Sequence, residues 1–181
     1  MRLFPDSFID QDPSNMYENI INFPENLISG AEIAEKAIHR GYDFNNILFL
    51  GMGGSAIGGD LVRSIYQAEI KQPFTVNRDY DIPGSVSSQT LVIASSYSGN
   101  TEETLSALEK AAEHTEQIVC ITTGGKLKTW ADKKNKETVI LPPGLPPRAA
   151  LGYSLSATFT VLSKLGIISA SPQELKDSAA W

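Results

Sequence analysis

The sequence lacks several features that would point to particular classes of protein. Its single cysteine, Cys120, excludes a disulfide within the chain, and together with two histidines it falls short of the Cys and His sets that hold zinc. No apolar run approaches the roughly 20 residues that a membrane-spanning helix needs. The net charge of −6 argues against binding to nucleic-acid phosphates. We therefore expect no metal site, no membrane contact and no nucleic-acid partner.

The first residues also lack the pattern of a secretory signal peptide. Met1 to Asp6 contain one arginine, followed by a proline and an acid. We therefore predict a cytoplasmic protein. Cys120 lies within the apolar run 118–122, where a small buried residue is expected.

Five short apolar runs after Gly41 predict five strands. Two N-terminal segments, 15–23 and 24–40, instead have apolar residues at helical spacing. The predicted strands are 47–50, 74–77, 91–95, 117–122 and 138–141, and further helical patterns cover 56–67, 101–114, 126–134 and 149–165.

The alternation of strands and helices predicts an α/β fold. Parallel strands joined by crossover helices make a sheet that is covered by helices on both faces. Ligands of such sheets bind beyond the carboxyl ends of the strands, so function is expected in the loops that follow each strand.

The loop after the first predicted strand is rich in glycine. Residues 51–59 contain five glycines and only small or apolar side chains. Glycines let backbone N–H groups approach an anion, and the following helix adds its positive end. A tight turn with close helix packing would explain two of these glycines, but hardly all five.

The loop 95–103, between the third predicted strand and its helix, carries hydroxyl groups. Ser98 and Thr101 can cap the helix or donate hydrogen bonds to a phosphate. Glu102 and Glu103 fall in the first helical turn, where carboxylates suit the helix dipole better than they suit catalysis. With the glycine loop, this loop forms a candidate phosphate site.

Arg148 follows the proline-rich turn 142–147 at the expected start of a helix. A cation there opposes the helix dipole, which makes sense if the arginine faces the negative charge of a substrate. A solvated or carboxylate-paired arginine is an equally good explanation from spacing alone.

A dinucleotide site is the main alternative. Gly51, Gly53 and Ala56 match the relaxed dinucleotide-binding pattern, but the residues 77–79 that should contact the ribose are ambiguous. The hydroxyl-rich loop 95–103 favours a sugar phosphate, because a dinucleotide site does not need a second phosphate-binding loop.

The motifs 51–55 and 96–104 resemble those of the SIS, or sugar isomerase, domain family. With the segment 146–153, the chain is similar over nearly its whole length to the N-terminal half of bifunctional phosphoglucose/phosphomannose isomerases. The resemblance implies a three-layer αβα sandwich, flavodoxin-like, with a five-stranded parallel sheet. It also implies a site without a cofactor, in which the sugar phosphate contacts Gly53, Gly54, Ser55, Ser96, Ser98 and Thr101.

By the same resemblance, Arg148 is the active-site arginine that stabilises an enediolate intermediate. The chain would divide into a helical extension (1–44), the SIS domain (45–168) and a linker (169–181) toward a second SIS domain that is absent here. In the family, that second half supplies the proton-transfer glutamate, and the complete protein is expected to be a homodimer.

A non-catalytic SIS module that binds a sugar phosphate and regulates another process is a further alternative. Such regulators usually carry a DNA-binding helix-turn-helix. The segment 1–40 is acidic and lacks a basic recognition helix, which counts against this alternative.

Overall fold

The computed structural model describes residues 11–179. The predictions that rest on residues 1–10, including the one about a signal peptide, lie outside this part. The described chain contains a five-stranded parallel sheet with the order β2-β1-β3-β4-β5, and this confirms the predicted fold class. The strands are β1 (Asn46–Gly51), β2 (Phe74–Asn77), β3 (Thr90–Ser96), β4 (Ile118–Thr122) and β5 (Glu137–Ile140).

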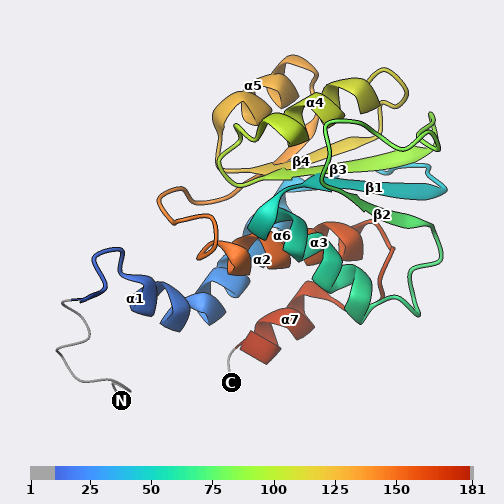
Figure 1. Cartoon of the computed structure of the whole chain (residues 1–181). Coiled ribbons are helices and arrows are strands. Elements are labelled where there is room, and N and C mark those ends of the chain that lie inside the picture. The colour runs from blue at the N-terminus through green and yellow to red at the C-terminus, as the bar shows by residue number, and fades with distance from the viewer. Residues whose placement is uncertain (1–10, 180–181) are drawn as a thin grey trace.

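Helices cover both faces of the sheet, as Figure 1 shows. One layer contains α4 and α5, and the other contains α2, α3, α6 and α7. The described helices are α1 (Met16–Ile21), α2 (Phe23–Ala37), α3 (Gly53–Ile65), α4 (Glu102–Ala111), α5 (Gly125–Lys133), α6 (Leu151–Lys164) and α7 (Pro172–Ala179).

Each face of the sheet has its own hydrophobic core, because successive side chains of a strand point to opposite faces. Phe49 and Ile93 pack under the layer of α2, α3 and α6, while Leu48 and Val92 pack under α4 and α5. Cys120 belongs to the second core and is fully buried, as predicted, and this burial raises the pKa of its thiol to about 12. The thiol is therefore a packing group.

Glycines allow close helix crossings in the layer that contains α2. A Cβ added at Gly152 of α6 would lie 2.9 Å from Asn26 Cβ of α2, and one added at Gly30 of α2 would overlap Ser156 of α6. The N-terminal helix α2 therefore belongs to the layer that covers the sheet and packs directly on α6.

The segment predicted to be a linker, 169–181, contains the helix α7. Its Lys176 forms an ion pair with Glu35 of α2 at 2.6 Å, and Leu175 packs against the neighbouring core. The predicted linker therefore contains a helix that contacts the domain through Leu175 and Lys176. None of the helices in residues 11–179 is long and apolar enough to cross a membrane.

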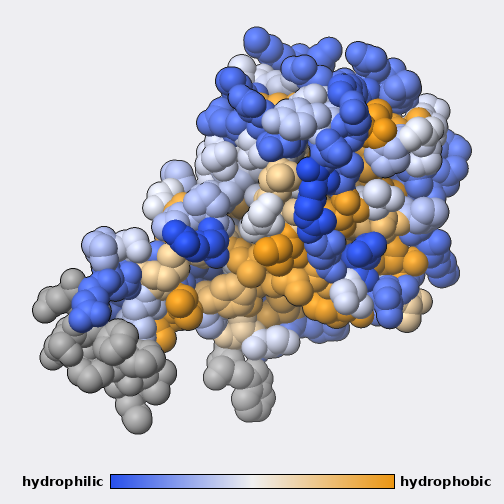
Figure 2. All heavy atoms as spheres, in the orientation of Figure 1, coloured by the Kyte–Doolittle hydropathy of each residue, from blue (hydrophilic) through white to orange (hydrophobic). Residues whose placement is uncertain are grey.

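One outer face of α3 remains uncovered within the described chain. Ile57, Leu61 and Ile65 are spaced four residues apart and stay 43%, 37% and 66% exposed. Figure 2 shows hydrophobic residues gathered on this side of the molecule. This row is called the α3 apolar face below.

Candidate functional site

The loops that were predicted to carry chemistry lie at the carboxyl edge of the sheet. β1 and β3 are neighbours, with Gly51 opposite Ser95, yet α3 and α4 that follow them cover opposite faces. Ligands of open parallel sheets bind where the direction of the connections changes in this way. The N-termini of α3 and α4 flank that position.

Ser55, in the first turn of α3, joins these two loops. Its Oγ accepts a hydrogen bond of 3.1 Å from the backbone N–H of Tyr97, which lies just after β3. Ser55 is only 8% exposed. The hydroxyl therefore fixes the distance between the loops before any ligand binds.

Ser96 and Thr101 hold the loop between β3 and α4 in a closed turn. The Oγ of Ser96 lies 2.8 Å from Oγ1 of Thr101 and accepts a hydrogen bond of 3.1 Å from the N–H of Gly99. Ser96 is 1% exposed, whereas Thr101 is half-buried. Ser96 therefore acts within the loop, and Thr101 is the member of the pair that a ligand can reach.

The capping of α4 that the sequence suggested is absent. Thr101 is the residue before the helix, but its side chain makes no capping hydrogen bond. Ser98 is exposed, and its Oγ accepts a hydrogen bond of 3.2 Å from the N–H of Asn100 instead. The first N–H groups of α4 thus have no side-chain cap, and a helix end of this kind attracts anions.

Packing and backbone geometry explain all five glycines at the β1–α3 turn. This corrects the expectation that five glycines are too many for a tight turn with close helix packing. A Cβ at Gly59 would lie 2.8 Å from the Phe49 ring, and one at Gly58 would lie 3.2 Å from the carbonyl oxygen of Ser154. Close contacts also explain Gly51 and Gly54, and Gly53 has a positive φ of 50°. The count of glycines therefore gives no independent support for an anion site.

Arg148 lies in the turn that precedes α6, two residues before the N-cap at Ala150. Its side chain is exposed and makes no ion pair or hydrogen bond within residues 11–179. The explanation by a paired carboxylate is therefore excluded for this part of the chain. Arg148 and Gly54 line one shallow depression, so the arginine lies beside the N-terminus of α3.

Tyr97 organises the candidate site, although no sequence pattern predicted a role for it. Its hydroxyl donates a hydrogen bond of 2.7 Å to the carbonyl of Pro142 and accepts one of 3.3 Å from the N–H of Leu145. Its carbonyl accepts a hydrogen bond of 2.8 Å from the Thr123 hydroxyl. Burial raises the pKa of Tyr97, so the phenol stays protonated and can donate. Tyr97 thus links its own loop to two others, through its hydroxyl to the turn at 142–145 and through its backbone carbonyl to Thr123.

Asn100 is a second residue whose role no sequence pattern predicted. Its Nδ2 donates a hydrogen bond of 3.1 Å to the carbonyl of Ser98, and its Oδ1 accepts one of 3.1 Å from the N–H of Lys126 in α5. The carbonyl of Gly99 accepts the N–H of Leu127 at 2.9 Å. The turn that carries Ser98 is therefore fixed against the start of α5.

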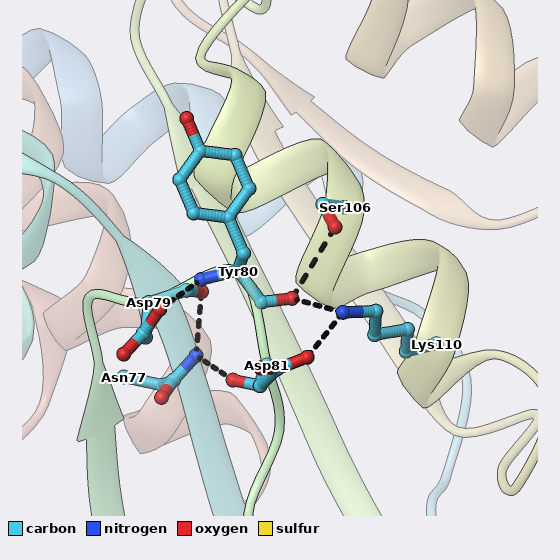
Figure 3. Close-up of polar contacts among 6 residues, drawn as sticks. All are labelled: Asn77, Asp79, Tyr80, Asp81, Ser106 and Lys110. Atoms are coloured by element: carbon cyan, nitrogen blue, oxygen red, sulfur yellow. Dashed lines mark hydrogen bonds and ion pairs between the residues drawn. The ribbon is translucent and has the colours of Figure 1, made fainter.

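The end of β2 does not resemble a ribose-binding position. Asn77 donates hydrogen bonds of 3.1 and 2.9 Å to the carbonyls of Asp79 and Asp81, as Figure 3 shows. Arg78 forms an ion pair with Asp60 of α3. These side chains hold the loop in place, which weakens the case for a dinucleotide. Within the described residues, no group of three or more His, Cys, Asp or Glu side chains could hold a metal ion.

The chain is similar to known proteins over most of its length. A bifunctional phosphoglucose/phosphomannose isomerase of Caldicellulosiruptor bescii is 44% identical over 165 residues, which cover 90% of this chain and 49% of the relative. A D-glucosamine-6-phosphate 4-epimerase of Sulfolobus acidocaldarius is 34% identical over 156 residues, 83% of this chain and 46% of the relative. The chain spans about half the length of these curated relatives.

Solved structures share the fold at lower identity. The tagatose-6-phosphate ketose/aldose isomerase of Escherichia coli superimposes with a TM-score of 0.63 at 18% identity, over 91% of this chain and 50% of that one. The family model of the SIS domain matches residues 42–167. The matched segment includes every strand of the sheet and every residue of the candidate site. The chain belongs to the SIS domain family.

Proposed function

We propose that this chain binds a sugar 6-phosphate and forms the phosphate-binding half of an aldose-ketose isomerase. The substrates would be glucose 6-phosphate or mannose 6-phosphate and fructose 6-phosphate. The observation that carries the proposal is the uncapped N-terminus of α4, where the exposed Ser98 hydroxyl and the accessible Thr101 hydroxyl lie beside free N–H groups. The names of the two curated relatives support the substrate class, because both refer to a phosphorylated hexose.

Within this proposal, the residues have distinct roles. Ser98 and Thr101 donate hydrogen bonds to the phosphate, and Gly53 and Gly54 offer backbone contacts from the other loop. Ser55 and Ser96 border the phosphate while they hold the loops together. Arg148 stabilises the negative charge that develops on the enediolate. The site would need no cofactor.

The proposal extends to the whole protein. The segment 1–44 would be a helical extension, 45–168 the SIS domain, and 169–181 a connection toward a second SIS domain. The α3 apolar face supports a partner surface, because a row of uncovered apolar side chains is typical of an interface. A homodimer of the complete protein and a cytoplasmic location belong to the same proposal.

Replacing Ser98 with alanine should weaken the binding of fructose 6-phosphate. A lost hydrogen bond to a charged group costs roughly 1.5–3 kcal/mol, or about 10- to 150-fold in Kd. Isothermal titration calorimetry on the 181-residue chain measures this change directly. Thr101→Ala should act in the same direction, and Thr101→Ser should restore most of the affinity because it keeps the hydroxyl.

Ser88→Ala is the matched control, because Ser88 is an exposed serine at the opposite, amino end of β3. It should leave the Kd unchanged. Equal affinities for Ser98→Ala, Thr101→Ala and the parent, with the fold intact by circular dichroism, would move the phosphate site away from α4.

Replacing Arg148 with lysine should weaken the binding of a transition-state mimic more than the binding of the substrate. A sugar phosphate analogue with a carboxylate at the enediolate position should bind at least about 10-fold more weakly to Arg148→Lys, because lysine lacks the bidentate fork. Fructose 6-phosphate should bind with a nearly unchanged Kd. A similar loss for both ligands would instead assign Arg148 to ground-state binding.

The relationship to a 4-epimerase raises a second candidate reaction on the same substrate class. The higher identity to the phosphoglucose/phosphomannose isomerase favours the isomerase. Binding does not separate the two reactions, but analysis of the products of a complete protein does, because epimerisation at C4 leaves the aldose carbonyl in place.

A further inference from the structure

The loop after β2 is fastened to α4 by a compact set of hydrogen bonds, drawn in Figure 3. The carbonyl of Tyr80 accepts the Ser106 hydroxyl at 3.3 Å and the Lys110 ammonium at 3.0 Å. Lys110 also pairs with Asp81, and Asn77 closes the turn from the other side. The Tyr80 backbone is thus fixed against the middle of α4.

The Tyr80 side chain, in contrast, makes no ring contact within the described residues. It is 45% exposed, and its hydroxyl makes no hydrogen bond there. Figure 3 shows the ring beside α4, on the side of Ser106 that faces away from Lys110. Ser106 lies four residues, or about 6 Å of helix rise, from Glu102 at the start of α4. The ring therefore extends toward the helix end that carries the proposed phosphate site.

The electrostatic surroundings agree with this position. The charges of Glu103 and Glu102, in the first turn of α4, raise the pKa of the Tyr80 phenol. The phenol is therefore a neutral hydrogen-bond donor. The two carboxylates also repel a phosphate group placed beside the ring. A phosphate would sit at the N–H groups of the helix end, and a neutral part of the ligand would face the ring.

A fixed backbone under a free aromatic side chain is the arrangement that a binding site requires. Tyrosine provides contact area and a polar tip at a low cost in conformational entropy. Isolated apolar side chains are common on protein surfaces, but they do not need a backbone fixed on two sides. We propose that Tyr80 contacts the sugar of the bound sugar phosphate and donates a hydrogen bond to one of its hydroxyl groups. This inference rests on the function proposed above.

Two ligands and two substitutions test the inference. Tyr80→Phe removes only the hydroxyl, and it should raise the Kd of fructose 6-phosphate about 2- to 10-fold while the Kd of inorganic phosphate stays the same. Ser98→Ala should weaken both ligands. Tyr66→Phe is the matched control, because Tyr66 packs on Phe159 in the layer across the sheet, and it should change neither Kd.

A double-mutant cycle separates positioning from general stability. Asn77→Ala loosens the loop, so it should weaken fructose 6-phosphate binding in the parent but cause a clearly smaller loss in a Tyr80→Phe background. Additive losses would show that the loop does not act through the Tyr80 hydroxyl and would overturn the inference. An unchanged Kd for fructose 6-phosphate in Tyr80→Phe, or equal losses for both ligands, would also overturn it. If the parent chain binds no sugar phosphate, the proposed function and this inference fail together.

Discussion

Gly99→Ala is expected to destabilise the chain by about 3 kcal/mol or more, which is a large part of the 5–15 kcal/mol that holds a typical domain together. Gly99 has a φ of 70°, and a non-glycine residue in this region costs about 1–2 kcal/mol. The added Cβ would overlap the carbonyl oxygen of Gly124 and lie 2.7 Å from its carbonyl carbon. Because these are backbone atoms, a change of rotamer offers no relief, and overpacking adds about 1–3 kcal/mol. Urea unfolding measures the loss as a shift of the midpoint.

Gly166→Ala is the matched control for this prediction. Gly166 has the same φ of 70°, but no heavy atom lies within 4 Å of its added Cβ. This variant should therefore lose only the conformational part, about 1–2 kcal/mol. Equal losses at the two positions would mean that the turn at Gly99 can move away from Gly124.

The same substitution should reduce ligand binding in molecules that remain folded. Gly99 connects Ser98 to Asn100, and its N–H and carbonyl are bonded to Ser96 and Leu127. A shift of this turn moves the Ser98 hydroxyl away from the end of α4. The stability of the loop and the geometry of the proposed phosphate site therefore both depend on the close contact between Gly99 and Gly124.

Much of the fold could be predicted from local sequence patterns. Buried parallel strands are short apolar runs, so the predicted strand 74–77 is identical to β2, and the other four agree to within one residue at each end. α7 escaped prediction because its residues 172–179 are mostly polar and none is buried. Its position depends on contacts such as the ion pair between Lys176 and Glu35, which are 141 residues apart.

The meeting of the candidate-site loops at one edge of the sheet was predictable from the sequence, but the hydrogen bonds between those loops were not. Residues that follow parallel strands meet at one edge of the sheet, which brought Ser55 and the turn at Ser98 together. The hydrogen bond from Tyr97 to Ser55 spans 42 residues, and the one from Tyr97 to Pro142 spans 45. No local pattern encodes such pairs. For the same reason, the sequence did not indicate that Gly58 packs against α6 and Gly59 against β1.

The 181-residue chain should bind fructose 6-phosphate yet convert it to glucose 6-phosphate at no more than the background rate. The isomerisation needs a base that moves a proton between C1 and C2, and a positioned base typically contributes 10²–10⁴-fold in rate. Glu102 and Glu103 are the carboxylates nearest to the proposed phosphate site along the chain. Both lie in the first turn of α4, where they complement the helix dipole.

A coupled assay with glucose-6-phosphate dehydrogenase measures this activity, and the full-length isomerase of Caldicellulosiruptor bescii is the positive control. Binding without turnover, observed on the same sample by calorimetry and by the assay, would fit a chain that holds the phosphate and Arg148 but lacks the base. Turnover well above background that disappears in Glu102→Gln or Glu103→Gln would instead place the base at the start of α4. Both variants should stay folded, because removing one charge at a helix end costs only about 0.3–1 kcal/mol of stability. A loss of turnover would therefore show a catalytic role for these acids in addition to their interaction with the helix dipole.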